Sequence, residues 1–173
     1  MFDYIRYHLT LPVFLIFVFL LDGALVNVLL ASVDTYAYQI IPSLLLISLT
    51  LIPLYYNQPR TIYLMAFIIG FLYDSYYNGI LGINLFLFPA VVYLSYQVKN
   101  RFPLNFYSIW VWAVIMYLLY HNVIYWLYRI LRIHGDTYLK FLASFLGPSL
   151  LFNSLVIFLL NLIIYRLVNW VKG

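Results

Sequence analysis

Long apolar runs, separated by short polar segments, constrain this chain more than any other feature. Several runs approach the roughly 20 residues that an α-helix needs to cross a bilayer. Only 8% of the 173 residues are charged, 66% are hydrophobic, and the mean hydropathy is +0.99. A water-soluble surface cannot be built from this composition. The sequence therefore predicts an integral membrane protein.

The apolar runs predict an all-α fold: a polytopic membrane protein with a single bundle of about six transmembrane helices. The runs are continuous rather than alternating, which favours helices over a β-barrel, because a helix satisfies its backbone within one segment. The expected spans are residues 9–31, 40–56, 61–77, 80–98, 106–127 and 148–168. They fill the chain as one domain. Residues 138–146 are apolar but short enough to lie in the membrane interface.

Prolines mark the expected ends of two spans. Pro42 is expected in the first turn of the second span, where a missing N–H costs little. Pro53 is expected to kink or end that span. Pro148, directly after Gly147, is expected to open the last span.

Six spans place both termini on one side of the membrane. The N-terminal segment carries Asp3 and Arg6 and has no small-residue cleavage site, so the first run is expected to be a permanent span. More cations fall on the side of the termini, which predicts that both termini are cytoplasmic. These cations are Arg6, Arg60, Lys99, Arg101, Arg166 and Lys172, against Arg129, Arg132 and Lys140 on the other side. They explain the net charge of +4 without nucleic-acid binding.

A polar, glycine-rich stretch at residues 70–84 separates the third and fourth runs. It contains Asp74, Asn78 and the glycines Gly70, Gly79 and Gly82. The Asn-Gly step predicts a tight turn, and thus the tip of a helical hairpin. Asp74 is then either a loop acid in headgroup water or part of a packed, hydrogen-bonded tip that fixes a partner or ligand surface.

Four further polar residues fall inside the runs: Asp22, His121, Asn122 and Asn153. Asp22 lies near mid-span, so it must be protonated, face a polar cavity or meet a partner. We expect Asp22, His121 and Asn153 to converge, with Asp74 and Asn78, on one outward-facing polar cluster. The alternative for His121, Asn122 and Asn153 is simple hydrogen bonding between packed helices.

Enzyme signatures are missing from the sequence. It has no Cys, and all five acidic residues are Asp, which excludes thiol chemistry and His-Glu-x-x-His metal sites. Asp22 and Asp74 raise the question of an intramembrane aspartyl protease, and Tyr73-Asp74 has that class's Tyr-Asp step. The companion Gly-x-Gly-Asp motif is absent. We therefore expect no catalysis, no cofactor and no metal.

The glycine-rich stretch carries a family resemblance. Gly70-Phe71-Leu72-Tyr73-Asp74, followed by Gly79 and Leu81-Gly82, resembles the MreD family of rod-shape-determining membrane proteins. In that family a Gly-x-x-x-Asp step closes one helix and a glycine turn opens the next. Residues 42–46 resemble the family's Pro-Asp-Leu-Leu-Leu opening of the second span, with Ser43 in place of the acid.

The resemblance implies a non-enzymatic scaffold in the bacterial cell membrane. Such proteins bind MreC and help determine cell shape, alongside RodA-type glycosyltransferases and penicillin-binding transpeptidases that synthesise lateral or peripheral peptidoglycan. Membrane lipids are the other expected partners. The partner-binding or structural tip would comprise Gly70, Asp74, Asn78, Gly79 and Gly82.

The resemblance also supplies an alternative. The MreD layout is similar to the substrate-binding subunits of energy-coupling-factor transporters, which bind vitamins. Those subunits typically dock their partner through an Ala-x-x-x-Ala pair on the first span. This chain has no such pair, and Ala24 and Ala31 are seven residues apart. That absence favours the MreD interpretation.

Overall fold

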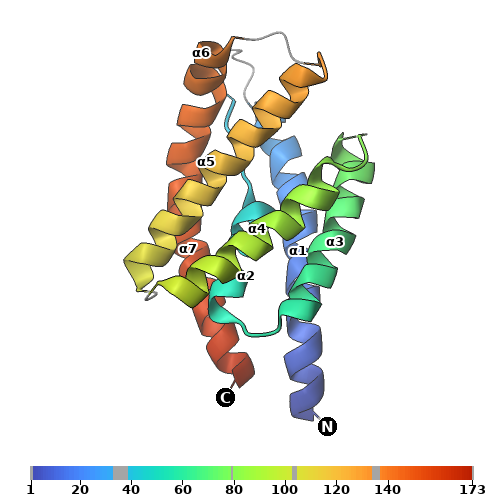
Figure 1. Cartoon of the computed structure of the whole chain (residues 1–173), viewed down its shortest axis with the longest axis vertical. Helices are drawn as coiled ribbons and strands as arrows, with labels where there is room; N and C mark the ends of the chain where they lie inside the picture. The colour runs from blue at the N-terminus through green and yellow to red at the C-terminus, as the bar shows by residue number, and fades with distance from the viewer. Residues whose placement is uncertain (1, 33–38, 79, 103–104, 134–136, 173) are drawn as a thin grey trace.

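The computed structural model describes residues 2–32, 39–78, 80–102, 105–133 and 137–172. Within these ranges it describes only the backbone of residues 2–9, 27–32, 78 and 169–172. The described chain is helical and contains no strand (Figure 1). Its elements are α1 (Phe2–Ser32), α2 (Leu44–Tyr55), α3 (Pro59–Tyr73), the π-helical turn η1 (Asp74–Asn78), α4 (Ile83–Arg101), α5 (Phe106–Ile130), α6 (Tyr138–Phe141), the π-helical turn η2 (Leu142–Leu146) and α7 (Gly147–Lys172).

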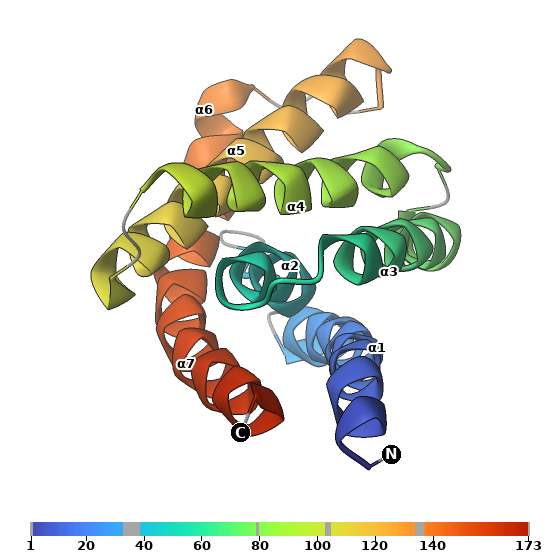
Figure 2. The same ribbon diagram turned by 60° about the horizontal axis from the view of Figure 1, so that its bottom comes forward.

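The short helix α2 is the centre of the bundle. It contacts α1, α4, α5 and α7, and Figure 2 shows it enclosed by its neighbours. Every residue from Leu45 to Leu54 is buried. A helix that is apolar on nearly all sides is typically buried, in a protein core or in a membrane.

The second expected span begins later than predicted. Residues 39–43 are not helical, so Pro42 precedes α2 instead of lying in its first turn. Proline disfavours the helical conformation of the residue before it, here Ile41. The extended segment is bonded to the last long helix, because Ser149 Oγ accepts from the Ile41 N–H at 3.1 Å. The result is a central helix of only 12 residues.

The last expected span begins earlier than predicted. α6, η2 and α7 follow one another without a break, so residues 138–146 extend the long helix and Pro148 lies inside it. Pro148 has no N–H to donate to the Ser144 carbonyl, four residues earlier. Gln39 N donates to that carbonyl instead, at 2.8 Å. The proline thus frees an acceptor that fixes the extended segment.

The two hairpin ends lie opposite the chain termini. α1 begins and α7 ends at the same end of the bundle, while the α3–α4 and α5–α6 connections point the other way (Figure 1). Two described helices are long and apolar enough to cross a membrane by themselves, Phe106–Ile130 and Tyr138–Val168. The apolar stretches of α1 and α2, Thr10–Val26 and Leu44–Tyr55, are shorter.

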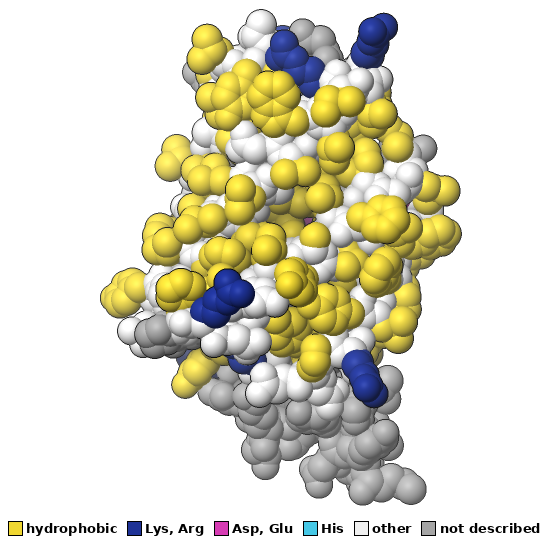
Figure 3. Space-filling view, in the orientation of Figure 1, with side chains coloured by type: hydrophobic (Ala, Val, Ile, Leu, Met, Phe, Trp, Pro, Cys, Tyr) yellow, Lys and Arg dark blue, Asp and Glu magenta, His cyan; other side chains and the backbone are white. Residues whose placement is uncertain are grey.

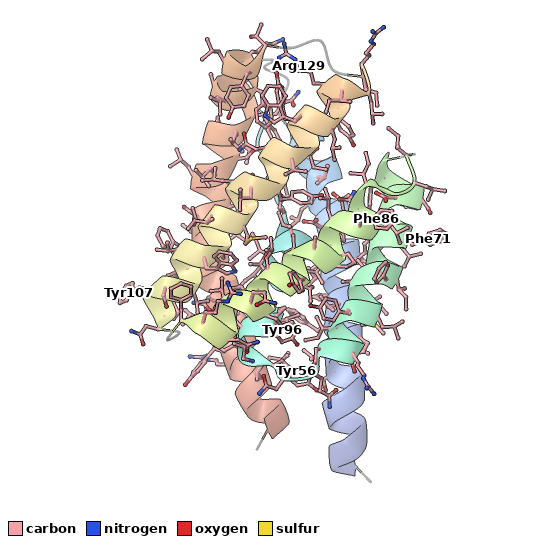
Figure 4. The ribbon with its side chains drawn as sticks, in the orientation of Figure 1. Tyr56, Phe71, Phe86, Tyr96, Tyr107 and Arg129 are labelled. Atoms are coloured by element: carbon pink, nitrogen blue, oxygen red, sulfur yellow. The ribbon has the colours of Figure 1, made fainter. Side chains whose placement is uncertain are left out.

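The outer surface is apolar. Hydrophobic side chains cover most of the face in Figure 3, and the basic side chains gather toward its ends. Phe71 and Phe86, on α3 and α4, project away from the bundle (Figure 4) and are 51% and 67% exposed. Such a surface fits contact with lipid rather than water.

Candidate functional site

Asp74 is the cap of a helix to which it does not belong. Its carboxylate is fully buried and accepts backbone N–H groups from Gly82 (3.0 Å), Asn84 (2.9 and 3.0 Å) and Leu85 (3.0 Å). The Asn84 side-chain nitrogen also donates to it, at 2.8 Å. α4 begins at Ile83, so these are N–H groups that have no partner within the helix. A carboxylate also suits the positive end of the helix dipole.

Two glycines make this cap possible. Gly82, the residue before α4, has φ +112°, a left-handed conformation that side chains disfavour. A Cβ on Gly70 would lie 2.6 Å from the Asn84 carbonyl oxygen and 2.9 Å from Leu85 Cα. Gly70 therefore lets α3 approach the first turn of α4 backbone to backbone. We call residues 70–85 the α3–α4 corner.

Successive side-chain hydrogen bonds link the α3–α4 corner to α5. Asn84 donates to Asp74, and its side-chain oxygen accepts a hydrogen bond from the Tyr120 hydroxyl. The Tyr120 ring stacks on Phe88 of α4, with centroids 6.0 Å apart. The Asp74 carboxylate thus helps to fix three helices.

Asp22 performs the same task for α2. It is 4% exposed and accepts the Leu44 N–H at 2.8 Å, at the first residue of α2. Asn153 of α7 accepts the neighbouring Ser43 N–H at 3.0 Å and donates to the Ile41 carbonyl at 2.9 Å. Ser43 stands at the N-cap position but makes no capping bond with its own side chain. The N-terminal cap of α2 therefore comes from Asp22 on α1 and Asn153 on α7.

The other end of α2 is held by Lys99. Its ammonium donates to the carbonyls of Pro53 (3.1 Å) and Tyr56 (3.2 Å) and to the Asn57 side chain (2.7 Å). Tyr96, one turn earlier on α4, donates to the same Tyr56 carbonyl at 3.2 Å (Figure 4). The central helix therefore has an acid at its N-terminus and a cation at its C-terminus, which matches its dipole.

His121 and Asn122 face different neighbours. The His121 ring is 3.4 Å from Ser43 Oγ and packs against Tyr117, with centroids 4.4 Å apart. Asn122 accepts from the Tyr138 hydroxyl at 2.7 Å and so joins α5 to α6. Adjacent helical residues point about 100° apart, which separates the two side chains.

The polar residues therefore meet only in part. Asp22, Ser43 and His121 line one cavity of about 190 Å³, which we call the inner chamber. Asn153 is outside the lining but accepts a hydrogen bond from the Ser43 N–H. Asp74 is also outside the lining, and Asn84 links it to Tyr120, which lines the chamber. The Asn122 side chain takes no part in that lining. The Asn78 side chain and Gly79 lie outside the described residues.

An outer chamber of about 460 Å³ adjoins the inner one. Both share Ile41, His121 and Phe145 as lining, and the outer chamber extends to Gln39 and Lys140. Figure 3 shows a hollow in the middle of the viewed face, with a trace of acidic colour at its bottom. α4 and α5 diverge on this side of the bundle (Figures 1 and 2).

The chemistry of the site is that of helix capping. No group of His and Asp among the described residues is placed to hold a metal ion. Both buried aspartates are occupied by backbone N–H groups. Three residues of the site were not predicted from the sequence: Lys99, Asn84 and Tyr120. Only Asn84 carried a signal, a polar residue close to the expected start of a span.

Comparison with known proteins then decides the family. The model of a protein family described as rod shape-determining protein MreD matches residues 7–171, almost the whole chain. The chain belongs to the MreD family. MreD proteins are membrane proteins involved in determining rod shape, which agrees with the resemblance carried by the α3–α4 corner. No curated protein and no solved structure matches the chain, so the likeness in layout to energy-coupling-factor subunits stays an expectation.

Proposed function

We propose that this MreD-family protein is a non-enzymatic membrane scaffold that binds MreC in the machinery of cell elongation. RodA-type glycosyltransferases and penicillin-binding transpeptidases are its further, indirect partners. The observation that supports this most is the family match over residues 7–171. The two buried aspartates add support, because carboxylates bonded to helix N-termini stabilise a fold and are poorly placed for acid–base chemistry.

The α3–α4 corner is the proposed MreC-binding rim. Its interior is fixed by the Asp74 cap, while Tyr76 and Leu81 on its surface are 79% and 63% exposed. Rigid support with exposed aromatic and aliphatic side chains is what a specific protein contact needs. Partner and rim can then meet with little loss of conformational entropy.

The proposed orientation places both termini in the cytoplasm and the corner outside, in the bacterial cell membrane. The common end of α1 and α7 supports this (Figure 1). The cations expected there from the sequence support it as well. In this arrangement the corner lies at the level where an extracytoplasmic partner would reach the bundle.

Crosslink-coupled purification from native membranes tests the proposal. We expect MreC to co-purify with the tagged wild-type protein. Recovery should fall for Tyr76→Ala combined with Leu81→Ala, and stay unchanged for the matched pair Tyr107→Ala with Phe102→Ala at the opposite end of α4 and the start of α5. Undiminished recovery of MreC with a normally expressed corner variant would argue against the rim, and absence of MreC in every sample would argue against the scaffold.

A further inference from the structure

The inner chamber has the composition of a binding site, and the proposed scaffold function does not use it. Asp22 is the only charged side chain in its lining among the described residues. The rings of Tyr73, Phe88, Tyr120 and Phe145 form much of the remaining wall. An ionisable residue inside a membrane bundle marks a functional site by default, since burying it is costly.

The polar groups of the chamber are mainly acceptors. The Leu44 and Leu45 N–H groups occupy two positions on the Asp22 carboxylate, and a carboxylate offers about four acceptor positions. The Tyr120 hydroxyl donates its hydrogen to Asn84, so its oxygen can only accept from a molecule in the chamber. Aromatic faces add negative potential from their quadrupoles. Acceptors and ring faces together favour a cation and disfavour an anion.

We propose that the inner chamber binds the ammonium group of an amphipathic primary amine, with Asp22 as its counter-ion. A carboxylate with several aromatic rings is a recognised environment for organic ammonium groups. A primary ammonium has three donors, which matches the acceptors of Asp22, Ser43 and Tyr120. The chemistry fits both an aminophospholipid headgroup and a free long-chain amine.

The outer chamber has room for the rest of the ligand. It is more than twice the volume of the inner chamber, at about 460 against 190 Å³, and the two adjoin, because Ile41, Ile124 and Phe145 line both. Its walls are mostly apolar and aromatic, and Lys140 is among the lining residues. An apolar chain fits such a wall.

Native mass spectrometry of the full-length protein tests this site. The probes are dodecylamine and dodecanol, which differ only in the polar group. We expect the wild-type protein to bind dodecylamine at least about tenfold more tightly than dodecanol. Asp22→Asn keeps an acceptor for the Leu44 N–H but removes the charge, and should abolish that preference. Equal binding of the two probes by the wild type, or an unchanged preference in a folded Asp22→Asn protein, would overturn the proposal.

Two further variants keep the test decisive if Asp22→Asn does not fold. Phe145→Leu removes a ring from the chamber and should weaken dodecylamine binding severalfold. Phe158→Leu makes the same change at an exposed position outside the chamber and should have no effect. Equal affinities for these two variants would contradict the site.

Nanodiscs distinguish the two sources of the amine. Selective retention of phosphatidylethanolamine over phosphatidylcholine, lost in the Phe145→Leu protein, assigns the site to a lipid headgroup. Dodecylamine binding without such retention assigns it to a free amine. Because MreC is absent from these samples, their result is independent of the scaffold proposal.

Discussion

Asp74 and Asn84 are bonded through both the backbone and the side chain of the asparagine, with nitrogen–oxygen distances of 2.8 to 3.0 Å. This pair joins the end of α3 to the beginning of α4, and both residues are fully buried. The geometry of this pair explains the two glycines near it. Gly70 provides the close approach of the helices, and Gly82 provides the backbone turn before α4.

Replacing Asp74 by Ala should destabilise the bundle by about 3–5 kcal/mol, because several buried N–H groups lose their acceptor together. We expect the thermal unfolding midpoint in detergent to fall by about 10 °C. Differential scanning fluorimetry measures it. Ser75→Ala, which changes the exposed next residue, is the control and should stay within about 0.5 kcal/mol of the wild type. Equal midpoints for the two variants would refute the capping role.

Gly70 and Gly23 should respond differently to alanine. A Cβ on Gly70 meets the backbone of Asn84, which cannot move without separating the helices, so we expect a loss of about 1–3 kcal/mol. A Cβ on Gly23 meets only the ring end of Tyr77, an exposed side chain that can rotate away. Gly23→Ala should therefore be within about 1 kcal/mol of the wild type. The same thermal measurement compares them, and a reversed order would contradict the packing argument.

Asp22 should tolerate Asn but not Lys. Asparagine keeps an oxygen for the Leu44 N–H, whereas lysine opposes that donor with another donor in a buried position. Membrane levels and gel-filtration profiles of the two variants measure the outcome. We expect a monodisperse peak for Asp22→Asn and aggregation or degradation of Asp22→Lys. Equal levels of both would remove the argument for a buried cap.

Lys99 should matter more than its neighbour Arg101. Lys99→Met leaves the Pro53 and Tyr56 carbonyls without their cation and should cost about 1–2 kcal/mol. Arg101 is exposed at the end of α4, so Arg101→Met removes the same charge with an expected change below about 0.5 kcal/mol. The thermal midpoints of the Lys99→Met and Arg101→Met proteins show whether Lys99 caps α2 or only helps to orient the protein in the membrane. Similar small shifts would favour topology alone.

The helical class and the corner could be predicted locally. Apolar runs show helices directly, and the start of α5 was placed at residue 106 because polar residues precede it. The short polar stretch at 70–84 showed where two helices meet. Each of these signals lies within a few residues of the feature that it predicts.

The caps of α2 could not be predicted in this way. Asp22 is 22 residues from Leu44, and Asn153 is 110 residues from Ser43. One hydrogen bond links the segment before α2 to the unbroken last helix, because the Ser144 carbonyl freed by Pro148 accepts from the Gln39 N–H. Such pairings depend on the tertiary arrangement, so the pattern of residues within one segment cannot predict them.

Site-specific crosslinking to MreC tests the central claim most directly. The chain has no cysteine, so single cysteines at Leu81 and Tyr76 on the α3–α4 corner, and at Tyr107 near the start of α5, can be introduced without a background. All three positions are highly exposed (Figure 4 shows Tyr107 projecting from the bundle). In membranes that contain MreC, we predict crosslinks to MreC from the two corner positions and none from Tyr107. Crosslinks from Tyr107 alone, or from none of the three in well-expressed proteins, would contradict the account.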